Sequence, residues 1–324
     1  MPGNAQHIGA RSSQQDSFGF GDLEDEEFLA HGGFVAVVCD GMGGMEHGDL
    51  AGRTAVRTFL DAYRRKNPSE SIPAALERSV REANDRVVDM AHDMGAAESV
   101  GTTLVAAVLL DSRPGDKTMY FISVGDSGLF HVSGEQIQMV NRPHVFANLL
   151  DSAVTRGAMS KEQALAHPER ESLTSFIGVE VLEEIDRNMD PWPICDGDSI
   201  LLASDGLFKT LTLEEILGCL NGHPQRWPDA LVARTLAKNY EFQDNVTVLS
   251  VTARDQPITA KLPPPAVEVE QAVKPEQTLL IPPARKRSRR MLAAVVIVAI
   301  AGIAIAGGGW WYKKHHTTHV MEKK

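Results

Sequence analysis

The sequence predicts an α+β domain with antiparallel sheets over residues 1–255. Two observations carry this prediction. Several β-rich segments follow one another through short turns typical of hairpins, and pairs of segments with helical periodicity interrupt them. A doubly wound parallel sheet would instead need strands and helices in regular alternation.

The first half of the domain begins with a strand and continues with two helices. Residues 34–39 form the apolar run FVAVVC, bounded by Gly-Gly and Asp-Gly, which is typical of a buried strand. Apolar residues then recur at helical spacing over 49–65 and again over 72–94. Gly95 follows the second helix as a natural C-terminal stop.

The second half of the domain is richer in strands. Residues 102–110 and 118–124 are β-rich, and the turn DSRPGD joins them. Ser133-Gly134 marks a second hairpin, and the capping-box pair Thr212 and Glu215 marks a helix start. The remaining predicted elements are strands 129–132, 136–140, 198–203 and 246–252 and helices 212–220 and 229–239.

The composition is globular, with an acidic main domain. Hydrophobic residues make up 43% and charged residues 23%, and the net charge is −11. Residues 1–255 carry 21 Lys and Arg against 39 Asp and Glu, whereas residues 256–324 carry 11 against 4. Such an acidic domain is not expected to bind nucleic acid, because phosphate backbones attract basic surfaces. The three cysteines cannot form a disulfide framework, and residues 1–11 carry no apolar export signal, so a cytoplasmic main domain is expected.

The C-terminal part predicts a membrane anchor. Residues 256–290 are Pro-rich and end in a basic cluster, which predicts an extended linker. Residues 291–312 contain no charge and would span about 33 Å as a helix, enough for a hydrocarbon core of about 30 Å. The basic cluster favours a cytoplasmic location for residues 1–290 and an extracytoplasmic tail over 313–324, as in a single-pass protein of the inner membrane. The alternatives are a buried core helix for the span and a nuclear-import signal for the cluster.

Four aspartates share one local setting. Asp40, Asp126 and Asp205 each follow an apolar strand and precede Gly or Ser-Gly, and Asp244 precedes the last strand. A strand tip holds a carboxylate rigidly at a sheet edge, where several together would repel one another unless cations neutralise them. Hard oxygen ligands select Mg²⁺ or Mn²⁺. At any one position a simple turn is the alternative, but four such turns in one acidic domain are not expected by chance.

Arg11 stands five residues before Asp16 in a polar segment. An ordinary surface cation is the default interpretation, but a guanidinium can also bind phosphate through two hydrogen bonds. Beside a two-metal centre, it would complete a phosphoester site in which an activated water attacks phosphorus. Other chemistries fit poorly, since no cysteine has an arginine six residues on and no P-loop, kinase or H-E-x-x-H pattern occurs.

Six motifs occur in the order and with the spacing of a known family. They are R-x4-D (Arg11 and Asp16), VVCDGMGG (37–44), GTTLVAAVL (101–109), FISVGDSG (121–128), LLASDGL (201–207) and QDNVTVL (243–249). The ordered set resembles the metal-dependent serine/threonine phosphatases of type 2C, the PPM family, in their bacterial form. The resemblance covers about residues 5–253. It implies a four-layer α/β-β/α sandwich, in which two antiparallel sheets face each other and a helix pair covers each.

The resemblance also implies a metal-ligand set. Asp40 would bridge two ions, Mn²⁺ or Mg²⁺, and the Gly41 carbonyl would bind one of them. Asp205 and Asp244 would hold the other ion. Asp126 with Asp205 would hold a third, weaker ion.

The remaining roles follow from the same resemblance. Asp16 would order metal-bound waters, and Arg11 would bind the substrate phosphate. Residues 143–178 look like the family's mobile flap, with a helix-loop-helix character. The reaction would be an in-line attack on phosphorus without a covalent intermediate.

Three positions depart from the family pattern. Gln15 stands where many members have Glu, and Met42 stands where eukaryotic members have a histidine. Gly128 replaces the usual arginine of the G-D-S-R motif and is the least expected change. The four positions of the two-metal set are intact, which favours an enzyme.

Three functional hypotheses remain. The first is a membrane-tethered cytoplasmic phosphatase that removes phosphate from serine and threonine of phosphoproteins and opposes a Ser/Thr kinase. A flexible linker would then raise the enzyme's effective concentration near membrane-bound substrates. The second is a non-catalytic phosphoprotein-binding scaffold on the same fold, which Gln15 and Gly128 support. The third is a metal-dependent hydrolase of small phosphoesters, which only substrate tests separate from the first.

Overall fold

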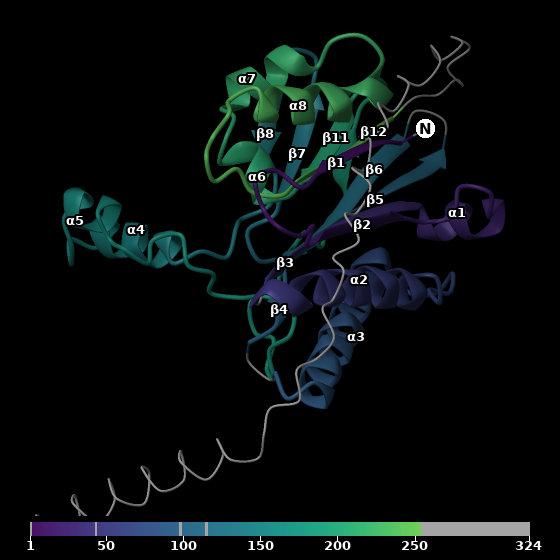
Figure 1. Cartoon of the computed structure of the whole chain (residues 1–324). Coiled ribbons are helices and arrows are strands. Elements are labelled where there is room, and N and C mark those ends of the chain that lie inside the picture. Colours follow the sequence, from purple (N-terminus) through teal and green to yellow (C-terminus); the bar gives the residue numbers. More distant parts are fainter. Residues whose placement is uncertain (1, 43, 97–98, 114–115, 254–324) are drawn as a thin grey trace, which may run out of the picture. The chain divides into compact units, whose positions relative to one another are not determined.

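The computed structural model of the chain describes residues 2–42, 44–96, 99–113 and 116–253 (Figure 1). The predicted linker 256–290, apolar span 291–312 and tail 313–324 lie outside the described residues. Within the described ranges, none of the helices combines the length and the apolar character needed to cross a bilayer.

Five antiparallel strands form the first sheet, in the order β1-β12-β11-β7-β8. Their bounds are Gly3–His7 (β1), Gly128–Ser133 (β7), Gln136–Met139 (β8), Ser199–Ala203 (β11) and Val246–Thr252 (β12). The N-terminal strand β1 therefore pairs with β12, the last described strand.

The second sheet follows the antiparallel path β10-β6-β5-β3-β2, and two short strands, β4 and β9, pair with β3 and β6. The strand bounds are Asp16–Phe20 (β2), Phe34–Met42 (β3), Gly101–Thr102 (β4), Leu104–Arg113 (β5), Asp116–Val124 (β6), Asp186–Arg187 (β9) and Trp192–Ile194 (β10).

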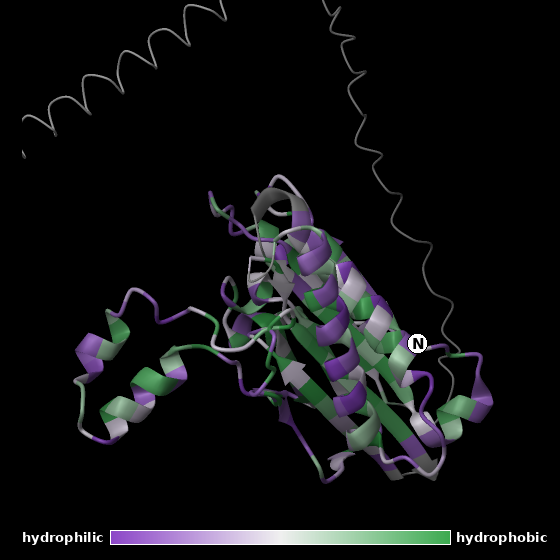
Figure 2. Cartoon of the chain, turned by 90° about the horizontal axis from the view of Figure 1, so that it is seen from below, coloured by the Kyte–Doolittle hydropathy of each residue, from purple (hydrophilic) through white to green (hydrophobic). Residues whose placement is uncertain are grey.

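The two sheets face each other, and helices cover their outer sides (Figure 1). Alternate residues of β3 point to opposite faces, as the strand period requires. Val38 packs between the sheets with Leu202 and Leu249, whereas Val37 packs outward against Phe59 of a helix. Figure 2 shows the same division by hydropathy, with the green strands inside and purple residues on the outer helices.

A helix pair covers each sheet. Gly44–Tyr63 (α2) and Ile72–Asp93 (α3) share one core with the second sheet. Leu213–Cys219 (α7) and Trp227–Leu236 (α8), together with the short Asp205–Phe208 (α6), share another core with the first sheet. The predicted α+β class and its four layers are therefore confirmed.

Most predicted elements are present, with some differences at their ends. The capping box of Thr212 and Glu215 forms as predicted. The helix predicted over 49–65 begins earlier, at Gly44, and β3 continues past residue 39 to Met42. Asp40 therefore lies inside a strand rather than at its tip, and the turn interpretation is wrong for this position.

The predicted flap region 143–178 contains two short helices, Ala147–Thr155 (α4) and Lys161–Leu165 (α5), which lie away from both sheets (Figures 1 and 2). Arg170 ties the pair together through an ion pair with Asp151 at 3.0 Å. Bridges from Val145 to Leu173 and from Thr102 to Ile177 close its base. The helix-loop-helix character expected here is confirmed.

Candidate functional site

Asp16 and Asp40 lie opposite each other on β2 and β3, as direct Cα partners in the antiparallel register. Two threonines fix the main chain of Asp40. Its N–H donates to Thr103 Oγ1 at 2.9 Å, and its carbonyl accepts from the Thr103 N–H at 2.8 Å and from Thr102 Oγ1 at 2.9 Å. Like charges directly opposite on two strands are unfavourable, so this pair requires a proton or a cation nearby.

The Asp16 carboxylate connects the two sheets. Its Oδ2 accepts hydrogen bonds from Ser204 Oγ and Thr247 Oγ1, both at 2.7 Å, and these hydroxyls belong to the first sheet's side of the site. Its Oδ1 is buried and meets no hydrogen-bond partner among the residues that the structure describes. Burial raises the pKa of Asp16 to about 6, although the two hydroxyls act in the opposite direction.

Asp126 and Asp205 come together on the first sheet's side. Gly128 of β7 pairs with Ala203 of β11, so the residues just before β7 and just after β11 are neighbours. Lys209, at the end of α6, binds both carboxylates. Its Nζ donates to Asp126 Oδ2 at 3.0 Å and to Asp205 Oδ2 at 2.5 Å.

Asp244 and Arg11 form an ion pair at the outer rim of the site. Arg11 Nη2 donates to Asp244 Oδ2 at 2.6 Å, while Asp244 Oδ1 accepts from the Asn245 N–H at 2.8 Å. The Arg11 side chain is 57% exposed, so it remains accessible to a ligand. The pair raises the pKa of Arg11, so its charge is permanent at any physiological pH.

Asn245 fixes the loop that carries Arg11. Its Oδ1 accepts from the Gln15 N–H at 2.7 Å, and its Nδ2 donates to the carbonyls of Ile8 at 2.8 Å and Ser13 at 3.1 Å. Asn245 is buried. Sequence reasoning missed this positioning residue, although it stands next to Asp244 in a quoted motif.

The five aspartates share one electrostatic environment. Burial raises the pKa of Asp40 well above its usual range, and the charges of the other four, Asp16, Asp205, Asp126 and Asp244, raise it further. Burial and the charge of Asp205 also raise the pKa of Asp126, against the effect of Lys209. The contacts place these carboxylates close together, since Asp16 pairs with Asp40 across two strands and Lys209 contacts both Asp126 and Asp205.

Gly41 is required by close packing. A Cβ at this position would lie 2.0 Å from the Gly48 carbonyl oxygen and 2.7 Å from that of Gln15. Only glycine therefore lets these backbones meet beside Asp40. All seven predicted site residues thus gather along the edge where the two sheets meet: Arg11, Asp16, Asp40, Gly41, Asp126, Asp205 and Asp244.

The side chains suit a hard divalent cation. They offer carboxylate oxygens, and within the described part of the chain the buried Asp16 Oδ1 has no hydrogen-bond partner. Among the residues that the structure describes, no three His, Cys, Asp or Glu side chains are arranged as a metal-binding group. Asp205 and Asp244 are paired instead with Lys209 and Arg11, so a metal that binds here must compete with two cations of the chain.

Close packing explains why position 128 is a glycine. A Cβ there would meet the Phe130 ring at 2.8 Å and the Phe208 ring at 2.9 Å. These two rings form an edge-to-face pair with centroids 5.6 Å apart. The absence of a side chain at position 128 therefore lets these two rings pack closely beside Asp126.

His144 ties the flap region to the loop that carries Asp126. Its N–H donates to the Gly125 carbonyl at 2.9 Å, and its Nδ1 accepts from the Gly125 N–H at 3.1 Å. Gly125 has a positive φ of 96°, which glycine adopts without strain. Burial lowers the pKa of His144, which favours the neutral ring that this acceptor role needs.

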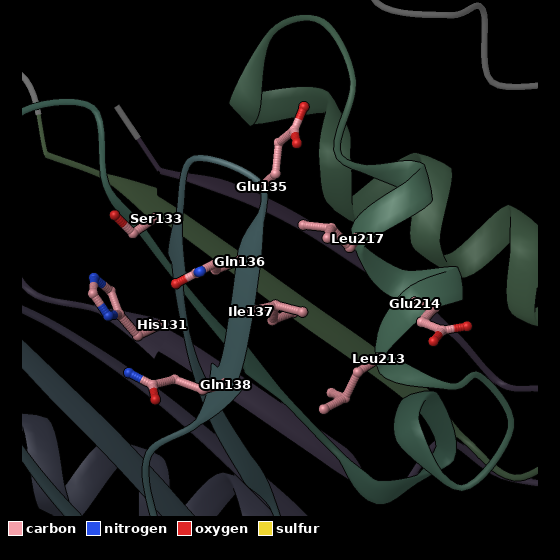
Figure 3. A pocket seen from close by; sticks show the side chains of 9 residues that line it. All are labelled: His131, Ser133, Glu135, Gln136, Ile137, Gln138, Leu213, Glu214 and Leu217. Atoms are coloured by element: carbon pink, nitrogen blue, oxygen red, sulfur yellow. The ribbon is translucent and has the colours of Figure 1, made fainter.

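A separate pocket of about 590 Å³ lies between the β7–β8 hairpin and α7 (Figure 3). It is lined by His131, Ser133, Glu135, Gln136, Ile137, Gln138, Leu213, Glu214 and Leu217. It contains none of the predicted site residues and lies toward the end of β7 that is remote from Asp126.

Comparison with known proteins identifies the fold and the family. Residues 4–243 match the family model described as Protein phosphatase 2C. The serine/threonine phosphatase stp of Listeria innocua is 31% identical over 220 residues, which cover 67% of this chain and 83% of the Listeria protein.

Solved structures give the same fold. The serine/threonine phosphatase of S. agalactiae matches with a TM-score of 0.66 at 23% identity, over 78% of this chain and 99% of that one. The catalytic domain of the phosphatase PstP, solved with 2 manganese ions, matches with a TM-score of 0.60 at 22% identity, over 79% and 98%. Because the family model covers most of the chain and the four-layer fold agrees with it, this chain belongs to the protein phosphatase 2C family.

Proposed function

We propose that the chain is a metal-dependent phosphatase that hydrolyses phosphoserine and phosphothreonine in proteins. One observation carries the proposal. Five aspartates from distant parts of the sequence converge at one sheet edge, where the buried Asp16 Oδ1 has no hydrogen-bond partner among the described residues. An acidic site of this kind repels a phosphate group unless divalent cations are present. The phosphatase names of the relatives support the same reaction class.

The cofactors proposed are two Mn²⁺ or Mg²⁺ ions. When bound, they lower the pKa of the attacking water and neutralise charge on the phosphoryl group. Asp40 of β3 would bridge both ions, and the Gly41 carbonyl would bind one of them. Asp205 and Asp244 would hold the other ion from the first sheet's side. The manganese reported in PstP supports this choice of metal.

The protein's own groups then orient the substrate. Arg11 is exposed and needs only to turn from Asp244 to bind two phosphoryl oxygens. Water adds to phosphorus, the bond to the serine or threonine oxygen breaks on the opposite side, and that oxygen takes a proton. The products are inorganic phosphate and the free hydroxyl side chain.

The proposed setting is the cytoplasmic face of the inner membrane. The support is the charge-free span 291–312 behind a basic cluster and a Pro-rich linker of about 35 residues. Such a tether would keep the domain near membrane-bound phosphoproteins and their Ser/Thr kinase. Full-length protein should therefore sediment with membranes and resist a carbonate wash, and its release by the wash would refute the anchor.

Phosphate release from a phosphothreonine peptide tests the activity. The purified chain should release phosphate with Mn²⁺, lose this activity in EDTA, and regain it when Mn²⁺ is restored. Asp205→Asn should lower turnover by orders of magnitude in a folded protein. Peptide binding without phosphate release would instead support the scaffold, and release only from small phosphoesters would support the third hypothesis.

A further inference from the structure

Lys209 lies directly between two carboxylates of the site. Its Nζ is 3.0 Å from Asp126 Oδ2 and 2.5 Å from Asp205 Oδ2. The Asp126 and Asp205 side chains are only 9% and 15% exposed, so both contacts with the ammonium are largely shielded from water. This single cation bridges two acidic residues that the sequence places 79 positions apart.

The helix α6 presents the lysine in this position. α6 begins at Asp205, and the Lys209 N–H donates to the Asp205 carbonyl at 2.9 Å, one helical turn later. Residues four apart lie on the same face of a helix, so the lysine side chain extends over the carboxylate that begins the helix. The contact between Lys209 and Asp205 therefore follows from the local helix backbone.

Lys209 is the cationic member of a three-group cluster. One ammonium contacts two carboxylates, so the cluster keeps a net negative charge within an acidic site.

The other end of the site differs. Arg11 binds Asp244 alone, and both side chains are substantially exposed, at 57% and 39%. Water and salt weaken such a pair, so a ligand can displace it. Lys209 has two acidic partners that are much less exposed, so a metal that displaces it must break two contacts that are better shielded from water.

We infer that the Lys209 ammonium takes the place of a third metal ion between Asp126 and Asp205. The site then binds two exchangeable divalent ions, and Asp126 is a ligand of the lysine rather than of a metal. This inference rests on the proposed metal-dependent function and adds the number of ions and a positioning role for Lys209.

The number of bound ions tests this inference without measuring activity. The full-length chain would be purified in detergent, stripped with EDTA, and dialysed against Mn²⁺ at increasing concentrations, and bound metal would be counted per chain. Wild type should saturate at two ions. Lys209→Met should saturate at three, because the two carboxylates are then free for a metal, and Lys209→Met combined with Asp126→Asn should return to two.

A matched lysine serves as the control. Lys238 also binds a carboxylate, Glu215 at 2.6 Å, and is 26% exposed against 44% for Lys209, but Glu215 lies in α7 outside the acidic site. Lys238→Met should therefore keep two ions. Lys209→Gln provides a second variant with a polar head, should the methionine variant fail to fold, and it should also gain the third ion.

The outcomes are distinguishable. Three ions in wild type, or two in both folded Lys209 variants, would overturn the role of Lys209 and leave the two-metal phosphatase intact. Fewer than two ions in wild type, with no metal-dependent phosphate release, would overturn the proposed function together with the inference. A thermal unfolding series gives a second measure, since added Mn²⁺ should raise the Tm of Lys209→Met more than that of wild type.

Discussion

Asp16 and Asp40 are cross-strand partners on β2 and β3, and their two carboxyl groups face a buried site. Cross-strand pairs of opposite charge or apolar character stabilise a sheet, whereas two like charges weaken it. The fold therefore contains an unfavourable pair at the edge where its two sheets meet, which is typical of functional sites whose stability depends on a ligand.

Replacing Asp40 should separate stability from function. Asp40→Asn removes one of the facing charges, so the metal-free protein should unfold at a higher temperature than wild type. Turnover should fall by orders of magnitude, because the predicted bridging ligand is lost. Thermal unfolding in EDTA and phosphate release in Mn²⁺ measure the two effects. A lower Tm for the metal-free variant would show that the repulsion is already relieved in wild type.

The stability of the metal-free protein should depend on pH through Asp16. Its folded pKa of about 6 lies above its ordinary value of 3.8, so the folded state binds the proton more tightly than the unfolded state. The free energy of unfolding should therefore fall as pH rises from about 4 to about 6, and stay lower above that. Denaturant unfolding at a series of pH values measures the slope.

Asp16→Asn provides the comparison for the pH series. It cannot ionise, and it still offers an oxygen to Ser204 and Thr247. The slope between pH 4 and 6 should become shallower in this variant. An unchanged slope would assign the pH dependence to other carboxylates of the site.

Gly128→Ala should destabilise the protein by about 1–3 kcal/mol, as overpacking does in a filled core. The added methyl would press on the buried Phe130 ring at 2.8 Å, and Phe208 closes the other side at 2.9 Å. Gly218→Ala in α7 is the control, because a Cβ there meets nothing within 4 Å and alanine favours a helix. Denaturant unfolding compares the two variants. Equal stability of Gly128→Ala and wild type would mean that the rings move aside freely, and that the missing arginine needs another explanation.

The sequence was sufficient for the fold class and for the acidic site because both depend on strong local signals. Apolar runs predicted the central strands, and helical periodicity predicted α2, α3, α7 and α8. The Asp-Gly and Asp-Ser-Gly sequences located the carboxylates, since glycine is required wherever another backbone approaches closely, as at Gly41. The short strands β1 and β2 were missed because GNAQH is polar and DSFGF has only two large apolar residues, so neither forms an apolar run, and both depend on pairing with β12 and β3.

Lys209, Asn245 and His144 were missed for a different reason. Each acts through contacts with residues far away in the sequence: Lys209 with Asp126, Asn245 with Ile8 and Ser13, and His144 with Gly125. A lysine four residues after an aspartate looks like an ordinary surface helix pair, and a histidine in a loop has no periodicity at all. Only the three-dimensional arrangement shows that such residues support the site.

The last prediction concerns Asn245, which connects β12 to the loop that carries Arg11. Asn245→Ala removes three hydrogen bonds to the main chain at Ile8, Ser13 and Gln15, and it leaves those groups without their partner. The loop should then hold Arg11 less firmly, so KM for a phosphopeptide should rise roughly tenfold or more, in the direction expected of Arg11→Ala.

Asn84→Ala is the matched control for this variant. Asn84 is equally buried and also bonds three main-chain groups, but these are the carbonyl of Val179 and the N–H groups of Gly178 and Val179. Both variants should lose stability, by about 1–3 kcal/mol for each buried partner left unsatisfied. Only Asn245→Ala should raise KM, and the effect should disappear when Arg11→Ala is already present, because both changes act on the same phosphate contact. If the two variants raise KM equally, the loss reflects general destabilisation, and Asn245 has no positioning role for Arg11.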